Sequence, residues 1–410
     1  VSLGVASGVG MLACDVQLTG IAQRMFAGVD SFSYLAIPMF MLAGKLMEYG
    51  GISARIVQVA KLLCAKVRGG LAITTIVACS FFAALSGSAP ATVSAIGGIM
   101  YPEMLKDGYD EEFAGGMISV AGNLGPLIPP SILMVTIGVC TGVSISDMFL
   151  GGIVIGILLA IALCLTAYII CRRRNYGGSH EQHAKGEVFK IIWSALPALG
   201  MPVIILGGTM SGVCTATESA AVAVIYAFVL AKFVYREMTW DDLYRTLVIS
   251  AKSSASILFI ISASTPFGWV LTLENVTTTV SNAVFAVVKS PILVYAAVVL
   301  ILIILGTFME SFTIIILTTP IFLPIVTAIG VDPVAYGLVL MFCICIGGVT
   351  PPLAVCLFNR KNPDRRVHSR CLYGLGNSAF RHNSSHDFPA DCLVPAQHCW
   401  HISSGPRTGI

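Results

Sequence analysis

Long apolar segments alternate with short polar connections along most of the chain. Several of them reach the ~20 residues that a helix needs to cross the hydrocarbon core of a bilayer, and others are shorter or interrupted. Short or broken spans are expected where the backbone lines a cavity inside a membrane protein. The pattern therefore predicts an all-α protein that crosses a membrane many times. The segments lie at residues 31–47, 71–85, 113–140, 148–170, 191–208, 217–235, 246–264, 291–309 and 334–358.

The chain also contains an internal repeat, because its turn-forming residues recur 222 positions apart without a gap. Each copy lies in apolar sequence, so each describes a membrane segment that breaks at glycine and proline and then resumes. Matched interruptions in the two halves of a hydrophobic chain are typical of secondary transporters whose binding site lies between two repeats. The pairs are Pro102 with Pro324, Gly108 with Gly330, Asp110 with Asp332, Gly115 with Gly337, Gly125 with Gly347, and Pro129 and Pro130 with Pro351 and Pro352.

Composition supports a membrane protein. Apolar residues make up 56% of the 410 residues, charged residues make up 11%, and the mean hydropathy is +0.87, whereas a soluble chain carries roughly 25% charged residues. The net charge of +3 is small, and without a basic stripe it argues against a nucleic-acid partner. The thirteen cysteines show no metal-ligand spacing, so most are expected to be small packing residues.

The sequence contains no pattern typical of an enzyme. It has no nucleophile triad arrangement, no His-Glu-x-x-His and no glycine-rich loop followed by Lys-Ser or Lys-Thr. The missing nucleotide-binding loop matters most, because it leaves an ion gradient as the energy source for transport. We therefore expect a transporter without a bound cofactor.

A polar and basic connection divides the chain into two halves. It begins with Arg172, Arg173 and Arg174, and we place it in the cytoplasm because basic loops are retained on that side. Since the chain starts without Met and its first residues read like the later part of a membrane helix, we expect an earlier segment to be missing. The predicted division is a first membrane repeat at 1–170, the connector at 171–190, a second membrane repeat at 191–358 and a polar tail at 359–410.

The tail after Phe358 differs in character from the rest of the chain. It holds five of the seven histidines and has no apolar run long enough to span a bilayer. Read one base later, codons for residues 359–364 permit Ile-Ala-Lys-Ile-Pro-Ile, and the shifted frame continues as a mostly apolar stretch. A reading-frame error would explain the tail, and the natural protein would then end in one more membrane helix. The alternative is a genuine polar tail.

Residues 52–66 alternate apolar side chains with Arg55, Gln58, Lys61 and Lys66 at helical spacing. This spacing suits a helix along the membrane surface with its cations at the lipid headgroups. Residues 275–289 occupy the corresponding place in the second half and are weakly amphipathic. For this second segment, an ordinary connector between spans is an equal alternative.

A first pair of breaks combines small residues, hydroxyls and proline. Residues 86–92, Ser-Gly-Ser-Ala-Pro-Ala-Thr, close an apolar run, and residues 309–313 are their counterpart 222 positions later. We expect each to be the tip of a re-entrant hairpin inside the membrane. Hydroxyls and freed carbonyls at such tips are oxygen ligands of the type that Na⁺ prefers, and helix ends direct their dipoles at the same point. The alternative is that small residues only let helices approach closely.

A second pair of breaks lies at residues 121–131 and 347–352, each containing two consecutive prolines. Proline has no N–H and clashes with the preceding turn, so two in a row leave carbonyl groups without helical donors. In hydrocarbon those carbonyls need a partner, and a cation is a suitable one. Among carboxylates, we expect Glu218 and Glu310 to be buried, where such groups have a functional or a strongly structural role. For Glu218 the two roles are equally weighted.

These segments together resemble the large membrane subunit of tripartite ATP-independent periplasmic (TRAP) transporters, the family of C4-dicarboxylate and sialic acid systems. The resemblance covers residues 3–358. It implies an elevator-type permease of two inverted repeats in the bacterial inner membrane. The motifs that carry it are the Ser86-Gly87-Ser88 hairpin followed by Gly97 and Pro102, Gly108-Tyr109, the run from Gly122 to Ser131, Thr217-Glu218-Ser219-Ala220-Ala221, and Thr350-Pro351-Pro352.

The resemblance also implies sites for coupling Na⁺ ions at the tips and breaks. A first site would use Ser86 and Ser88 with the backbone at Gly125, Ile128 and Pro130, and a second would use Gly306, Gly347 and Thr350. Asn123 departs from the family, which more often has Thr or a small residue there. We expect the substrate cavity to be lined by Asn123, Pro129, Glu310, Ser311 and Pro351.

The implied partners are a small four-helix membrane subunit, a soluble periplasmic binding protein that delivers an organic acid, and the surrounding membrane lipid. One alternative is a related single-chain symporter of anions and Na⁺. Another, of a different class, is a membrane scaffold or channel without coupling. The substrate itself cannot be named from this chain, because the binding protein is expected to set most of that choice.

Overall fold

The computed structural model describes residues 2–13, 19–64, 67–176, 185–287, 290–350 and 356. Within these ranges every regular element is a helix. The elements are α1 (Ser2–Ala13), α2 (Thr19–Ala27), η1 (Phe32–Leu35), α3 (Ala36–Tyr49), α4 (Ile52–Cys64), α5 (Gly70–Ser86), α6 (Ala89–Lys106), α7 (Glu111–Gly122), α8 (Leu124–Leu127), α9 (Ile132–Thr141), α10 (Ile145–Arg174), α11 (Lys185–Met210), α12 (Ala216–Val229), the π-helix η2 (Leu230–Val234), α13 (Trp240–Leu273), α14 (Val276–Val287), α15 (Pro291–Phe308), α16 (Ser311–Ala328) and α17 (Pro333–Val349).

Many of these helices have the length and composition of a membrane span. Six described helices meet both conditions, and the number rises to eight if each of two bent helix pairs is one span. In one bent pair, Glu111–Leu127 and Ile132–Thr141, the axis turns by 44° at the predicted glycine and proline break. Because a helix satisfies its own backbone hydrogen bonds, it is the form that a lipid-facing segment adopts. The expected all-α polytopic fold is confirmed.

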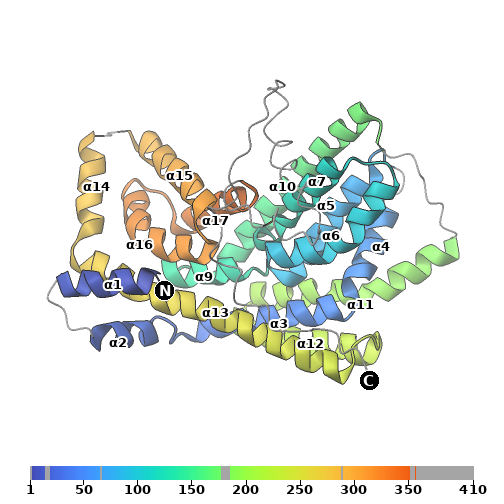
Figure 1. The fold of residues 1–410 in the computed structure, drawn as a ribbon, viewed down its shortest axis with the longest axis horizontal. Coiled ribbons are helices and arrows are strands. Elements are labelled where there is room, and N and C mark those ends of the chain that lie inside the picture. Colours follow the sequence, from blue (N-terminus) through green and yellow to red (C-terminus); the bar gives the residue numbers. More distant parts are fainter. Residues whose placement is uncertain are drawn as a thin grey trace, which may run out of the picture.

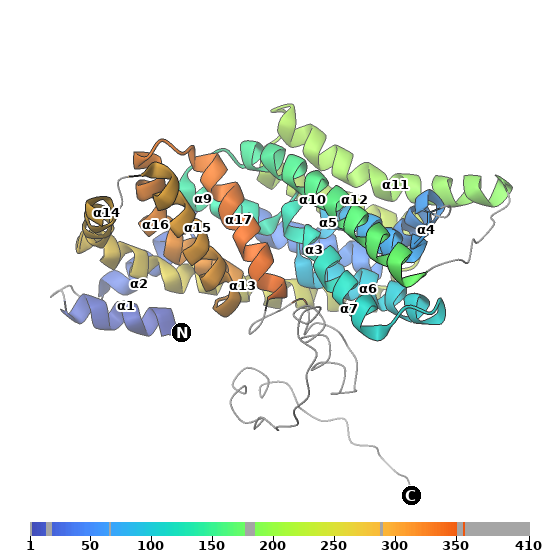
Figure 2. The same ribbon diagram turned by 90° about the horizontal axis from the view of Figure 1, so that it is seen from above.

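The internal repeat of the sequence reappears in the helix boundaries. α5 ends at Ser86 and α6 begins at Ala89, and 222 positions later α15 ends at Phe308 and α16 begins at Ser311. Both pairs pack together as hairpins, so both predicted tips are confirmed. The two hairpins lie on either side of the molecule, the first in blue to cyan and the second in orange (Figures 1 and 2).

The turns that follow the hairpins match as well. Gly108 and Gly330 both adopt the left-handed backbone conformation, with φ +84° and +89°, which glycine adopts at little cost. Asp110 and Asp332 then cap α7 and α17, because their carboxylates accept hydrogen bonds from N–H groups of the first helical turn. Each half thus contains the same hairpin, turn and following helix.

The helix α16 is a departure from the predicted spans, because the apolar pattern indicates no span at residues 311–328. Two prolines lie inside this helix, Pro320 and Pro324. The carbonyl of Pro320 lacks its helical donor, since residue 324 has no N–H. The hydroxyl of Thr277 in α14 donates to that carbonyl at 3.2 Å. The segment at 275–289, left open between a helix and a connector, is therefore helical over its described part and supports α16.

The longest helix, α13, extends along much of the molecule and packs against α1, α3 and α16 (Figures 1 and 2). Beside it, α12 packs against α3. Ala220, Ala223 and Ala227 of α12 are fully buried. Small residues let helix axes approach closely where no water is present to drive association, so this stripe explains the close packing of α12.

The prediction that Glu218 is buried is wrong. Its side chain is exposed and belongs to a capping box at the start of α12. The Glu218 carboxylate accepts hydrogen bonds from the N–H and the hydroxyl of Thr215 at 2.8 and 2.9 Å, and the Glu218 N–H donates to the Thr215 hydroxyl at 3.2 Å. This reciprocal arrangement satisfies free donors of the first turn. The role of Glu218 is therefore structural.

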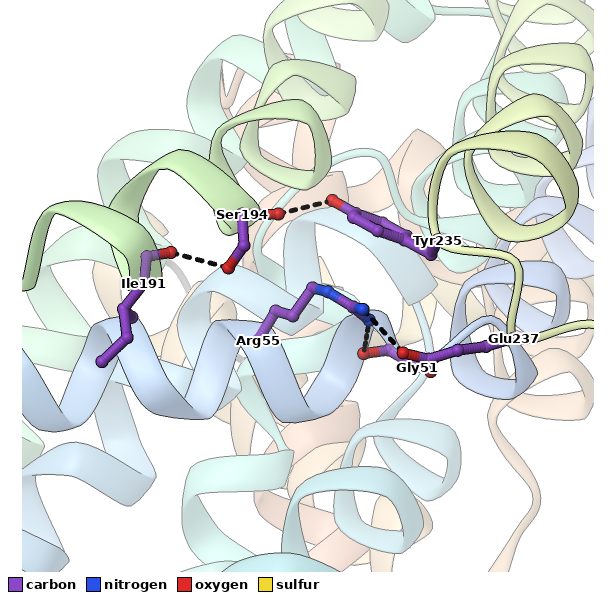
Figure 3. Close-up of polar contacts among 6 residues, drawn as sticks. All are labelled: Gly51, Arg55, Ile191, Ser194, Tyr235 and Glu237. Atoms are coloured by element: carbon purple, nitrogen blue, oxygen red, sulfur yellow. Dashed lines mark hydrogen bonds and ion pairs between the residues drawn. The ribbon is translucent and has the colours of Figure 1, made fainter. Parts of the chain in front are cut away.

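The predicted helix at 52–66 is confirmed as α4 over its described residues, and polar contacts fix its start (Figure 3). Its position along the membrane surface stays a prediction. Arg55 donates to the Glu237 carboxylate at 2.6 Å and to the Gly51 carbonyl at 2.9 Å. Its guanidinium lies 3.9 Å from the ring centre of Tyr235, whose hydroxyl donates to the Ser194 carbonyl at 2.9 Å. One arginine therefore ties α4 to the connection between α12 and α13, and Tyr235 extends the contact to α11.

The predicted division into two repeats, connector and tail stays a prediction. Residues 177–184 of the connector lie outside the described residues. So do Pro351, Pro352 and the tail from residue 359 onward, including the proposed frame change. At the second predicted break, the described backbone shows α17 ending at Val349 and Thr350 in an extended conformation.

Candidate functional site

A cavity of about 280 Å³ lies where the two hairpin tips meet. The first tip contributes Gly87 and Ser88, and the second contributes Met309, Glu310 and Ser311. Asn123 and Pro126 of the first half and Gly306, Cys345 and Gly348 of the second half complete much of the remaining wall. The cavity is therefore formed jointly by both copies of the repeat.

The first tip packs tightly against the second break of its own half. Gly87 has a left-handed backbone with φ +58°, and a Cβ atom there would lie 2.5 Å from the Pro130 carbonyl oxygen. A Cβ atom on Gly125 would lie 2.7 Å from the Ser88 carbonyl oxygen. Only glycine fits at these two positions. The structure thus brings Ser88, Gly125 and Pro130 together, as the predicted first Na⁺ site requires.

The hydroxyl of Ser86 donates its proton within the protein, and its oxygen lone pairs are free to accept. Its Oγ lies 3.0 Å from the Thr92 hydroxyl, and the Thr92 hydroxyl donates its single proton to the Ser88 carbonyl at 2.9 Å. Ser86 must therefore be the donor to Thr92. A hydroxyl oxygen accepts through two lone pairs, so Ser86 presents an oxygen suited to a cation.

The break between α8 and α9 exposes backbone carbonyls. In a continuous helix the carbonyls of Gly125 and Pro126 would accept from residues 129 and 130, but both are prolines without N–H groups. The chain is extended at Ile128, and α9 begins at Ile132 after its cap Ser131, whose hydroxyl accepts from the Met134 N–H at 3.4 Å. The predicted source of carbonyl ligands is therefore present in the backbone.

The second tip carries a carboxylate where the first carries a hydroxyl. Glu310 caps α16, and its carboxylate accepts from the N–H groups of Phe312 and Thr313 at 3.0 and 3.4 Å. Such bonds hold an anionic side chain at the positive end of a helix. The prediction that Glu310 is buried is wrong: its side chain is exposed and lines the cavity, because the residue caps α16 at the hairpin tip and does not lie inside a span. Among the described residues that line the cavity, it is the one with a formal charge.

The residues of the predicted second Na⁺ site are also neighbours. The Gly347 Cα approaches the Gly306 backbone so closely that a Cβ atom on Gly347 would collide with the Gly306 carbonyl. The Gly347 carbonyl accepts from the Thr350 N–H at 3.0 Å. The Thr350 hydroxyl donates to the Ile346 carbonyl at 2.7 Å, and among the described residues no donor occupies its two lone pairs, as in Ser86.

Asn123 joins the two halves across the cavity wall. Its amide NH₂ donates to the Cys345 carbonyl, which belongs to the residue 222 positions later in the chain. Its amide oxygen accepts from the Cys356 thiol at 3.2 Å. A side chain with both a donor and an acceptor is needed for this arrangement. The departure from the family pattern at residue 123 therefore has a structural use.

Four helix ends converge on the cavity. The caps Gly87 and Met309, where α5 and α15 finish, and the caps Ser88 and Glu310, where α6 and α16 start, all line it. The carboxyl ends of helices carry partial negative charge and favour cations, whereas the amino ends carry partial positive charge and favour anions. The arrangement can therefore hold a cation and an anion next to each other.

The predicted site residues separate into three groups. Ser88, Asn123, Gly306, Glu310 and Ser311 line the cavity. A second group does not line the cavity and packs behind or beside its wall: Ser86, Gly125, Ile128, Pro129, Pro130, Gly347 and Thr350. The third group is Pro351 alone, which lies outside the described residues.

Several further lining residues lie outside the predicted tips and breaks: Met41 of α3, Ile132 and Leu133 of α9, Ile257 of α13, Ile344 and Cys345 of α17, and Cys356. The repeat spacing carries a signal for Cys345, because it is the counterpart of Asn123. Met41 and Ile257 are ordinary apolar residues in long spans, and nothing in their local sequence marks them. They reach the cavity only through the packing of α3 and α13.

Comparison with known families gives a match over most of the chain. The family model described as "Tripartite ATP-independent periplasmic transporter, DctM component" matches residues 1–362. The match therefore ends close to Phe358, where the sequence changes character.

Individual relatives agree with the family match. The isethionate TRAP transporter permease protein DctMQ of Oleidesulfovibrio alaskensis is 39% identical over 359 residues, which are 87% of this chain and 56% of that protein. The C4-dicarboxylate TRAP transporter large permease protein DctM of Pseudomonas aeruginosa is 37% identical over 361 residues, 87% of this chain and 84% of that protein. The chain thus spans little more than half of the first relative and most of the second.

A solved structure has a similar fold. The YdaH transporter of Alcanivorax borkumensis, whose crystal structure is described as having an unusual topology, superposes with a TM-score of 0.63. The sequences are 12% identical, and the match covers 87% of this chain and 84% of that one. At this identity the likeness concerns the fold alone.

Proposed function

The chain belongs to the DctM component family of tripartite ATP-independent periplasmic transporters, and we propose that it imports a small organic acid by coupling to Na⁺. As a member of that family it is a multi-pass protein of the bacterial inner membrane and a transport component rather than an enzyme. The proposal has three specific parts: Na⁺ is the driving ion, the inverted repeats move as an elevator, and transport depends on a binding protein.

One observation carries the proposal: two copies of the same hairpin meet at one cavity with four helix ends directed at it. A transporter with alternating access needs a site between two repeats, and a channel or scaffold has no such need. The carbonyls and hydroxyls around the tips are suited to Na⁺, and the amino end of α6 is suited to an anion, whereas the amino end of α16 already holds the Glu310 carboxylate.

We assign the first Na⁺ site to Ser86 and Ser88 with the carbonyls of Gly125, Ile128 and Pro130. The open lone pairs of Ser86 and the Gly125 carbonyl, whose helical donor would be the N–H that Pro129 lacks, support this set. We assign the second site to Gly306, Gly347 and Thr350, which lie together and include a second hydroxyl with open lone pairs. The charge of Glu310 at the second tip strengthens binding of a cation there.

We assign the substrate to the cavity beside Asn123, Pro129, Glu310, Ser311 and Pro351. Relatives named for isethionate and for C4-dicarboxylates indicate a small organic anion. The proposed partners follow from the tripartite family: a small four-helix membrane subunit and a periplasmic binding protein. The cavity volume of about 280 Å³ is large enough for a small acid and its hydration.

The test is uptake by proteoliposomes that contain the chain, its small membrane subunit and, outside, the matching binding protein. A panel of radiolabelled dicarboxylates and sulfonates is offered with Na⁺ outside and the membrane potential clamped at zero. We expect saturable uptake of at least one acid without ATP. Replacing Na⁺ with choline should reduce the initial rate to the level of empty liposomes.

Two outcomes would replace the proposal. Unchanged uptake in choline would show that Na⁺ does not drive transport, as expected for an uncoupled channel. Na⁺-driven uptake that does not need the binding protein would indicate the single-chain symporter instead.

A further inference from the structure

A second cavity, of about 250 Å³, lies far from the hairpin tips, between α7 and the carboxyl end of α10. On α7 its wall is formed by Phe113, Gly116, Met117 and Val120, which share one face because helical residues three and four apart are neighbours. On α10 it is formed by Leu163, Thr166 and Ile170, with Arg174 at one end. This groove runs roughly 16 Å along α10 at 1.5 Å per residue.

The groove is open and borders the membrane. A Cβ atom added to Gly116 would meet nothing within 4 Å, so the space beside α7 is unfilled by other described parts of the protein. The neighbouring face of α10 is strongly exposed and apolar: Leu158, Ile161 and Leu165 are about 60% exposed. Such a face is stable against lipid or against another membrane helix. In the described part of the chain nothing covers it, so the groove opens toward the surroundings of α10.

The end of the groove carries charges of both signs. Arg174 pairs with Asp110 at 3.1 Å, with 53% and 38% of the two side chains exposed. Glu112, in the first turn of α7 two residues after Asp110, also lines this end of the groove and is exposed. Arg172 and Arg173 precede Arg174 in the basic stretch that we place at the cytoplasmic surface. The apolar groove thus ends in a mixed polar patch at the depth of lipid headgroups.

We propose that this groove binds one zwitterionic aminophospholipid of the inner leaflet, phosphatidylethanolamine in chemical class. One acyl chain lies along Phe113, Gly116 and Ile170. The phosphate accepts hydrogen bonds from Arg174, which has donors beyond those used by Asp110, and the primary ammonium donates to Glu112. An anionic lipid without an amine lacks the partner for Glu112, and a choline headgroup has no N–H to donate.

The experiment uses the full chain, purified in mild detergent, delipidated and titrated with defined phospholipids in native mass spectrometry. We expect one lipid to bind more tightly than the rest, with phosphatidylethanolamine preferred over phosphatidylglycerol and phosphatidylcholine of the same acyl chains. The Gly116→Leu variant fills the groove and removes contact with about two methylene groups, so this tight binding should weaken by about tenfold.

A matched control separates groove filling from a general effect of replacing a helical glycine. Gly98 of α6 also has nothing within 4 Å of an added Cβ and lies outside the groove, so Gly98→Leu should bind the lipid as the unmodified chain does. Glu112→Gln should leave total lipid binding in place and remove the preference for the primary amine. Equal binding by Gly116→Leu and Gly98→Leu, or equal affinity of the unmodified chain for the three headgroups, would overturn the proposal.

Discussion

At the scale of single residues, two hydroxyls in the two halves share the same electronic arrangement. Ser86 and Thr350 each donate their proton within the protein and so keep both lone pairs open. Ser88 lines the cavity as the N-terminal cap of α6. These residues therefore carry the most direct residue-level test of ion binding.

We predict that Ser88→Ala and Thr350→Ala each weaken Na⁺ binding while leaving folding nearly intact, because each removes one small hydroxyl. Losing one ligand in a buried site costs about 1 to 3 kcal/mol, which corresponds to a rise of half-saturating Na⁺ of about five- to hundredfold. Initial uptake rates against Na⁺ concentration measure this rise. Ser281→Ala in α14 is the control and should change nothing. Wild-type half-saturation in both site variants at equal expression would mean that these hydroxyls only pack.

A second prediction concerns Asn123, whose amide bonds both to the Cys345 carbonyl and to the Cys356 thiol. Asn123→Ala removes the buried hydrogen bond to the Cys345 carbonyl and leaves the Cys356 thiol without its acceptor, so we expect a loss of about 1 to 3 kcal/mol in stability. The apparent melting temperature in detergent measures the loss. Asn282→Ala, on the exposed face of α14, is the control. If Asn123→Ala and Asn282→Ala have the same apparent melting temperature, the Asn123 amide does not join the two halves.

At the scale of elements, the sequence predicted the hairpins and breaks well because their cause is local. Proline lacks an N–H and glycine tolerates a left-handed backbone, so both mark helix ends without reference to the rest of the fold. It predicted α16 poorly, because Pro320 and Pro324 look like breaks. α16 continues through both prolines, and the hydroxyl of Thr277 in another helix supplies a donor for the Pro320 carbonyl.

The burial of Glu218 was predicted wrongly for a related reason. A carboxylate inside an apolar run reads as intramembrane, whereas Thr215 three residues before it marks the start of a capped helix. The lining residues Met41 and Ile257 had no local signal at all. Which face of a long apolar helix meets the cavity is decided by packing, and in a span surrounded by apolar residues the periodicity does not show it.

The anchoring of α4 gives the prediction at this scale. Gly51 and Gly142 both have a positive φ, +71° and +73°. A Cβ atom added to Gly51 would collide with the Glu237 carboxylate, whereas a Cβ atom added to Gly142 would meet nothing within 4 Å. Both changes to Ala pay about 1 kcal/mol in backbone strain. We expect Gly51→Ala to lower stability further, because it also displaces Glu237 from Arg55.

Thermal unfolding in detergent checks this difference, with Gly142→Ala as the matched control. Adding Glu237→Ala to Gly51→Ala removes the obstructing carboxylate. That double variant should then melt no lower than the single Gly51→Ala variant. Identical melting of Gly51→Ala and Gly142→Ala would show that the Arg55 contact does not hold α4 in place.

At the scale of the whole molecule, the cavity exists only because both repeats contribute a tip, a break and helix ends to it. The sequence repeat predicted this joint site, since matched breaks in two halves must meet if they form one binding site. It did not predict the cross-connection through Asn123, or the lipid-facing groove between α7 and α10. Both depend on residues that are distant in the chain and become neighbours only in the folded protein.

The central claim is that this joint site couples the movement of an organic acid to that of Na⁺. The steady-state accumulation ratio of the transported acid in proteoliposomes, measured against an imposed Na⁺ gradient at zero membrane potential, tests it most directly. Each Na⁺ ion moving down a tenfold gradient supplies about 1.4 kcal/mol, so the ratio should rise by about tenfold per coupled ion for each tenfold increase of the gradient. A ratio that stays near one at every Na⁺ gradient would contradict the account.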